Sequence, residues 1–191
     1  MKHTIIYIPG LGDAYDVYRR KALKLWSFFG VSAVLVPMNW YAGGTYADRY
    51  ARVSKIITNA AADRHHVTLV GESAGASMAI NLFAAHPTVA NMITIAGVNR
   101  SSTPVAQKTL QRGPAFAISR QRVDASLRAI SSDRKRQMYT LSALSDAVVR
   151  VDSSRIIGAN NYRVWSVGHL FTITVCLTIF AAYITHLAKR N

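Results

Sequence analysis

The chain has 191 residues, half of them apolar, with 23 Lys and Arg against 9 Asp and Glu. That length fits a single unit, residues 1–191, and is too short for two catalytic domains of ordinary size. The formal charge of +14 is compatible with anionic partners but identifies none, and the single cysteine excludes an intramolecular disulfide or a multi-cysteine metal site. We expect no nucleic-acid partner, because the basic residues, densest between Arg100 and Arg136, are not interleaved with aromatic residues.

Short apolar runs rich in β-branched residues alternate along the chain with segments of helical spacing. We predict strands at 4–8, 32–36, 67–70, 92–96, 138–144 and 162–167. We predict helices at 15–29, 46–64 and 74–85, and a less regular helical stretch within 105–130. Parallel strands must be joined by crossover helices, so this alternation predicts the α/β class: a three-layer α/β/α fold with a mostly parallel sheet of about six strands. Ligands of such sheets bind at the carboxyl ends of the strands.

The segment from Gly71 to Gly75 carries the main chemical signal. It reads Gly-Glu-Ser-Ala-Gly, follows an apolar strand and precedes an Ala-rich helix. That setting is typical of a nucleophile elbow, in which a strained turn exposes the hydroxyl of Ser73 and the two glycines let strand and helix approach. The N–H of Ala74 at the helix N-terminus would then donate to an oxyanion. The alternative is a glycine-rich turn with an idle serine.

This segment resembles the nucleophile elbow of the α/β-hydrolase superfamily, in particular its compact serine esterases and lipases. The resemblance implies a minimal α/β-hydrolase fold with an oxyanion loop after the first strand. Residues 9–13 occupy that place, with Pro9 where the family usually has histidine. We therefore predict the N–H of Leu11 as the second oxyanion donor. The alternative is an ordinary strand-to-helix turn.

A serine hydroxyl needs an imidazole as general base, and the resemblance implies a Ser, Asp, His order along the chain. Of the 6 histidines, His169 directly follows a predicted strand, and the preceding glycine makes it similar to the family's Gly-His. Asp146 follows the strand before and lies in a segment similar to the family's Asp-x-Val. Asp152 is the alternative acid, but it lies farther from the strand and is flanked by arginines, which favours a surface ion pair.

These residues predict a serine hydrolase that cleaves carboxylic esters of short or medium acyl length through an acyl-enzyme on Ser73. The partner would be a small-molecule ester, and no metal or cofactor is required; thioester and amide substrates use the same apparatus. The basic segment around 100–137 is expected to form a short cap-like element. Four side chains are candidates for the substrate pocket, with core packing as the alternative for each: Trp40, Tyr41, Asn99 and Phe116.

The apolar stretch at 170–188 is long enough to be considered a membrane span. Thr174, Thr178, Ala182 and Thr185 recur at helical spacing, however, which favours one helix packed on the sheet over membrane association. The apolar run at 4–8 is too short for a secretory signal, so we expect a cytoplasmic location. A membrane-anchored esterase and a non-catalytic binding protein of the same fold stay as alternatives, and the oligomeric state is open.

Overall fold

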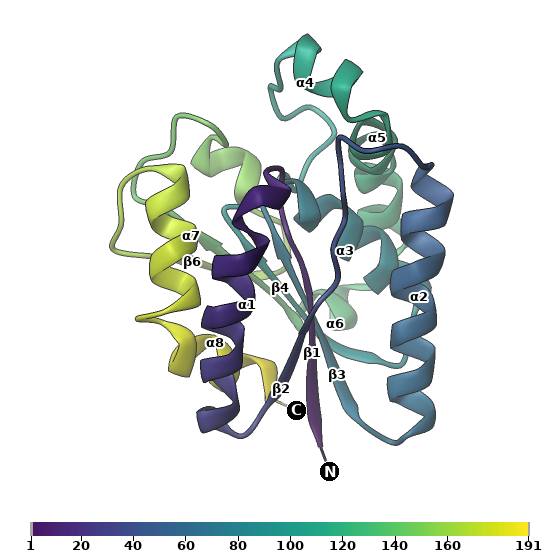
Figure 1. The fold of residues 1–191 in the computed structure, drawn as a ribbon, viewed down its shortest axis with the longest axis vertical. Helices are drawn as coiled ribbons and strands as arrows, with labels where there is room; N and C mark the ends of the chain where they lie inside the picture. Colours follow the sequence, from purple (N-terminus) through teal and green to yellow (C-terminus); the bar gives the residue numbers. More distant parts are fainter. Residues whose placement is uncertain (1, 191) are drawn as a thin grey trace.

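The computed structural model describes residues 2–190 and contains a six-stranded sheet between two layers of helices (Figure 1). The strand order is β2-β1-β3-β4-β5-β6, and every neighbouring pair is parallel. The predicted fold class, a three-layer α/β/α arrangement, is therefore confirmed. The strands are β1 (His3–Ile8), β2 (Ser32–Leu35), β3 (His66–Glu72), β4 (Val89–Ile95), β5 (Met138–Ser142) and β6 (Asn160–Arg163).

Helices make the crossover connections and cover both faces of the sheet. The α-helices are α1 (Asp16–Leu25), α2 (Tyr46–Ala62), α3 (Ala74–Ala85), α4 (Gln107–Arg112), α5 (Pro114–Ala129), α6 (Ser132–Lys135), α7 (His169–Leu177) and α8 (Ala181–Ala188). Three 3-10 turns join them: η1 (Asp13–Tyr15), η2 (Trp26–Phe29) and η3 (Val151–Ser154). The predicted helix at 74–85 matches α3 residue for residue.

Two apolar cores lie on the two faces of the sheet, and β1 contributes to both because its side chains alternate. Ile6 and Ile8 face the core under α2, α3 and α5. Ile5 and Tyr7 face the core under α1, α7 and α8. A strand buried on both faces reads as a continuous apolar run, which is why 4–8 was recognisable from its sequence.

The segment around 100–137 is not a cap as a whole. Its longest helix, α5, packs against α3, and Phe116 and Val123 belong to the core on that face. Only α4 and its flanking loops project above the carboxyl ends of the strands (Figure 1). The apolar positions of α5 make it a layer of the fold, so a cap-like element stays a prediction for α4 and its flanking loops alone.

The stretch at 170–188 is two helices and not one. α7 and α8 meet at an angle of 71° across a short break. At the break, the carbonyl oxygen of Leu177 accepts a hydrogen bond of 2.9 Å from the indole N–H of Trp26, while the N–H of Ala181 turns to Thr178. The indole of Trp26 thus donates to a carbonyl oxygen that, in a continuous helix, would accept a backbone N–H four residues farther along. Within residues 2–190 no single helix is long and apolar enough to cross a bilayer; the bent pair passes that test by length and composition.

The last two strands are shorter than predicted. β5 ends at Ser142 and β6 at Arg163, so residues 143–149 and 164–168 leave the sheet as loops. The two loops stay beside each other: the N–H of Leu144 donates to Ser166 O at 2.9 Å, and that of Gly168 donates to Ser145 O at 2.8 Å. This loop pair carries the acid and the histidine singled out by the sequence.

Candidate active site

Ser73 lies at a sharp turn between β3 and α3. Its φ of +49° is in a region that side-chain-bearing residues rarely adopt, so the backbone here is strained. The turn requires the flanking glycines. A Cβ on Gly71 would lie 2.6 Å from Ala76 Cα, and a Cβ on Gly75 would overlap the carbonyl oxygen of Ile8. The sequence pattern and the local geometry therefore agree.

The three residues predicted as nucleophile, base and acid lie within hydrogen-bond distance of one another in the predicted order. Ser73 Oγ is 2.9 Å from His169 Nε2, and His169 Nδ1 is 2.7 Å from Asp146 Oδ2. Ser73 comes from the end of β3, Asp146 from the loop after β5, and His169 from the first residue of α7. The side chains of His169 and Asp146 are only 9% and 2% exposed, so their hydrogen bond is shielded from water.

The second oxygen of Asp146 is held by backbone groups. Its Oδ1 accepts the N–H of Val148 at 2.8 Å and that of Val149 at 2.9 Å. Burial by itself would raise the pKa of Asp146, but the hydrogen bond from His169 and the two backbone donors outweigh burial and lower it. Asp146 is thus kept as a carboxylate that can orient an imidazole. Asp152, the alternative acid, lies away in η3, beside Arg155 at the edge of another surface hollow.

A buried ionic cluster lies directly beneath the elbow, and sequence reasoning missed it. Glu72 accepts Arg19 Nε at 2.8 Å and Nη2 at 2.5 Å, and it also accepts the phenol of Tyr7 at 2.5 Å. Arg19 further donates to Asp16 and to the carbonyl of Gly12, both at 2.9 Å. All of these side chains come from β1, α1 and β3. The available signals were an acidic residue directly before the serine of the Gly-x-Ser-x-Gly pattern and an arginine among the apolar positions of 15–29.

The same cluster holds the loop after β1. The N–H of Gly10 donates to Glu72 Oε1 at 3.3 Å, and Arg19 holds Gly12 from the other side, so Leu11 lies between two anchored residues. Burial by itself would lower the pKa of Arg19. Its hydrogen bonds to Glu72 and the charge of that carboxylate raise the pKa by more than burial lowers it, so the guanidinium stays charged. Burial and the Glu72 carboxylate both raise the pKa of Tyr7, which stays a neutral donor.

A cavity of about 240 Å³ opens over Ser73. Leu11 and Ala74, the predicted oxyanion donors, line it together with Ser73. The remaining lining is largely apolar and comes from the loops after β2, β4 and β5 and from α4 and α5. These residues are Tyr41, Val98, Pro104, Val105, Ala106, Thr109, Phe116, Val148 and Val149.

Two of the four predicted pocket residues line this cavity, Tyr41 and Phe116, and two do not. Trp40 is fully buried behind Phe116, with its indole N–H donating to Pro9 O at 3.0 Å. Asn99 is also fully buried and donates to Thr94 Oγ1 and to Ser154 O. Both predictions were wrong, because these side chains find partners in the interior instead of facing the cavity.

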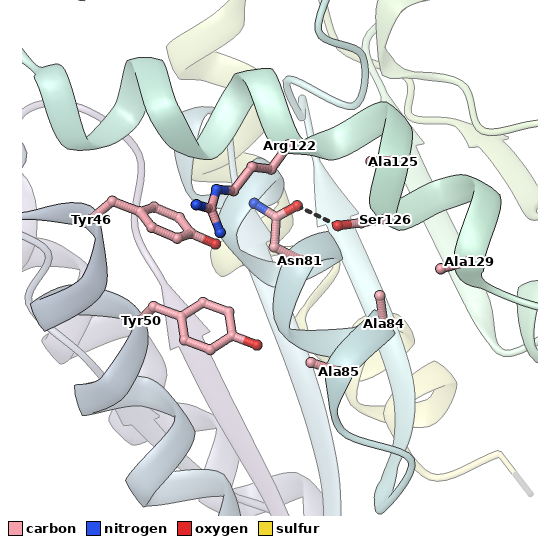
Figure 2. Close-up of a pocket in the computed structure, with 9 residues that line it drawn as sticks. All are labelled: Tyr46, Tyr50, Asn81, Ala84, Ala85, Arg122, Ala125, Ser126 and Ala129. Atoms are coloured by element: carbon pink, nitrogen blue, oxygen red, sulfur yellow. Dashed lines mark hydrogen bonds between the residues drawn. The ribbon is translucent and has the colours of Figure 1, made fainter.

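A second hollow, of about 360 Å³, lies between α2, α3 and α5 (Figure 2). Figure 2 shows the guanidinium of Arg122 beside the ring of Tyr46, 4.8 Å from its centroid, and Asn81 bonded to Ser126. The side-chain amide nitrogen of Asn81 donates to Ser119 O at 2.9 Å. Ser126, the one serine in the lining, is bonded to Asn81, and no histidine lines the hollow, so it offers no nucleophile–base pair.

Other candidate chemistry is weak in the described residues 2–190. They contain no group of three or more His, Cys, Asp or Glu side chains that could hold a metal ion. Cys176 is buried in the core under α7, and burial raises the pKa of its thiol to about 12. A thiol with so high a pKa is a poor nucleophile at neutral pH.

Comparison of the sequence with protein-family models and with curated proteins gave no match. Comparison with solved structures gave many matches. The chain is similar to the monoacylglycerol lipase of Paleococcus ferrophilus (TM-score 0.66, 12% identity, 97% of this chain and 93% of that one). It is similar to one of two metagenome-derived lipolytic enzymes (TM-score 0.69, 12% identity, 99% and 94%). It is also similar to carboxyl esterase 2 of the fungus Tuber melanosporum (TM-score 0.65, 14% identity, 96% and 75%). At such identities these likenesses concern the fold.

Proposed function

Because this chain has the α/β-hydrolase fold, which it shares with solved lipases and esterases, we propose that it is a serine hydrolase of carboxylic esters with short or medium acyl groups. The observation that carries the proposal is the bonded chain from Ser73 through His169 to Asp146 at the mouth of an apolar cavity. Fold alone would not carry it, since one fold hosts many functions.

The geometry supports an acyl-enzyme mechanism. Ser73 Oγ attacks the ester carbonyl carbon while His169 Nε2 takes the hydroxyl proton, and Asp146 stabilises the resulting imidazolium. The C–O bond to the alcohol then breaks, and the imidazolium returns its proton to the leaving oxygen. Water then attacks the acyl carbon and loses a proton to Nε2. The bond from that carbon to Ser73 Oγ breaks, the acid leaves, and the imidazolium returns its proton to Oγ. Each half uses the same two side-chain bonds.

The oxyanion would be bound by the N–H groups of Leu11 and Ala74. Both residues line the cavity beside Ser73, and Ala74 is the first residue of α3, where backbone N–H groups are free of intrahelical partners. Two such donors commonly contribute several kcal/mol to transition-state stabilisation. The bonds that fix Gly10 and Gly12 around Leu11 support this assignment, because a preorganised donor costs no reorganisation during reaction.

The acyl group would lie against the apolar lining contributed by Tyr41, Phe116 and Val148. The small volume of the cavity supports short or medium acyl chains over long ones. Thioesters and amides would meet the same nucleophile and stay as alternative substrates, and a cytoplasmic location stays a prediction from the sequence.

A fluorophosphonate probe tests the nucleophile, and p-nitrophenyl esters of increasing chain length test the substrate class. We expect labelling and turnover of the shorter esters by the unaltered chain, and loss of both in Ser73→Ala. Ser102→Ala, which changes an exposed serine outside the cavity lining, is the control and should retain both. Labelling that survives in Ser73→Ala would refute the assignment of Ser73 as the nucleophile. A folded protein that neither labels nor cleaves any ester, thioester or amide would favour the non-catalytic alternative.

A further inference from the structure

One face of the molecule exposes several large apolar side chains. α1, η2, α7 and α8 lie together on one side of the sheet, opposite α2 and α3 (Figure 1). Phe28, Ile179 and Tyr18 are 83%, 74% and 69% exposed there. We call this surface the α1–α7 face. Its apolar residues that are more than half exposed are Val17, Tyr18, Leu25, Phe28, Leu170, Phe171 and Ile179.

A groove of about 850 Å³ runs between α1 and α7 on this face. Tyr18 and Leu25 line it from α1, and Leu170 and Leu177 from α7. Its upper end lies at Leu170, the residue after His169, so the face reaches the rim of the candidate active site. Ser73 is not among the groove residues, and the groove is separate from the cavity above that serine.

The charge on this face is positive. Arg20, Lys21 and Lys24 are exposed on α1, and Lys189 and Arg190 are exposed after α8. α7 and α8 contain no Asp or Glu, and Asp16 of α1 is buried against Arg19. The exposed carboxylates of the described chain lie on other elements, for example Asp48 in α2 and Asp133 in α6.

We propose that the α1–α7 face binds the surface of an anionic lipid bilayer. A bilayer of this kind offers phosphates for the cations and, a few ångströms deeper, an apolar layer for Phe28, Phe171 and Ile179. Cations alone would fit a nucleic acid, and an apolar face alone would fit a protein. The combination of protruding apolar side chains, several cations and no exposed carboxylate on the same helices is complementary to anionic lipid.

Docking in this way requires neither Ser73 nor ester cleavage, so the proposal stands apart from the proposed function. It gives five of the 23 Lys and Arg residues a role that the active site does not explain. The groove beside Leu170 would lie along the lipid surface, close to His169.

Vesicle co-sedimentation tests the proposal, with Ser73→Ala as the background so that no lipid is cleaved. The probes are vesicles of phosphatidylcholine alone and vesicles that also contain about 30 mol % phosphatidylglycerol. We expect binding to the anionic vesicles that weakens at high salt and little binding to phosphatidylcholine alone. Since one Lys near an anionic surface contributes about fivefold in partitioning, Lys21→Gln/Lys24→Gln should lower the partition coefficient by at least about tenfold.

Two further variants separate this face from net charge. Lys55→Gln/Lys108→Gln removes the same charge from exposed positions on α2 and α4 and should stay within about twofold of the background. Phe28→Ser/Phe171→Ser keeps the charge and should weaken binding, with circular dichroism confirming that the fold is retained. Equal losses in both lysine pairs, no loss in the phenylalanine pair, or no binding to anionic vesicles would overturn the proposal. Self-association lost in the phenylalanine pair, without vesicle binding, would instead make the face an interface between copies.

Discussion

The two halves of the candidate active site are held by different means. The elbow half comprises β1, β3, α1 and the start of α3, and it positions Ser73 by backbone strain and by the buried cluster of Glu72 and Arg19. The histidine half comprises the loops after β5 and β6 and the start of α7. There, Asp146 and His169 are held by backbone bonds between two loops whose flanking residues, such as Trp165 and Val167, are exposed.

Because the two halves are held differently, we expect substitutions in one half to lower mainly stability and substitutions in the other to lower mainly turnover. Disturbing the elbow half leaves charged or strained groups in the interior, so stability should fall first. Disturbing the histidine half alters orientation at the surface end of the sheet, so turnover should fall while the fold survives. The four predictions below test this contrast, from the largest expected effect to the smallest.

The largest effect is expected for Asp146→Asn in the histidine half. An amide keeps the shape of the acid but favours the wrong imidazole tautomer, so kcat should fall by about 10⁴-fold on a p-nitrophenyl ester. Asp152→Asn is the matched control and should change kcat by less than about twofold. Equal losses in the two variants, or full activity of Asp146→Asn, would contradict the assigned acid.

In the elbow half, Arg19→Met leaves Glu72 buried without its cation. Breaking a buried pair in this way should lower the free energy of unfolding by about 3–5 kcal/mol, measured by urea denaturation. The control is Asp133→Asn, which removes the exposed partner of Arg136 and should cost less than about 1 kcal/mol. The double variant Arg19→Met/Glu72→Gln should recover part of the loss. If Arg19→Met and Asp133→Asn had the same unfolding free energy, the buried ion pair would not stabilise the elbow half, and the proposed difference between the two halves would be wrong.

The lowered pKa of Asp146 predicts a pH dependence of stability. A carboxyl whose folded-state pKa lies below its unfolded value of about 3.9 stabilises the fold above that pH. The contribution is lost as the pH falls through the lowered folded pKa, at about 1.4 kcal/mol per pKa unit of difference. The gap in unfolding free energy between the unaltered chain and Asp146→Asn should therefore shrink in acid. A gap that stays constant down to the acid transition would contradict the lowered pKa.

The smallest effect is expected for Val148→Ser. Val148 lines the cavity but its side chain is largely exposed, and the backbone N–H that bonds Asp146 is kept. Unfolding free energy should stay within about 0.5 kcal/mol, with a modest rise in KM for longer acyl esters. Leu69→Ala, fully buried in β3, should by comparison cost about 2–5 kcal/mol. A large loss of stability in Val148→Ser would mean that the histidine half is also part of the core.

Much of the site followed from local rules. The elbow at Ser73 depends on glycine sterics, and the helix at 74–85 on apolar spacing, both of which are written in the sequence. Asp146 and His169 were chosen because they follow predicted strands and because the resemblance to the α/β-hydrolase superfamily implies that order. Trp40 and Asn99 were misplaced because an aromatic or an amide can face a cavity or find a partner in the interior, and local pattern does not distinguish the two.

The sequence by itself determined the order of strands and helices, since apolar periodicity reports which side chains must be buried. It also determined the turn at Ser73, because only glycine permits the close approach of Gly75 to Ile8. Tertiary structure alone decided that Glu72 and Arg19 meet beneath the loop after β1, that Trp26 interrupts the helical stretch at Leu177, and that the loops after β5 and β6 pair. Those contacts join residues far apart in the chain, and their energy depends on distances that no local pattern encodes.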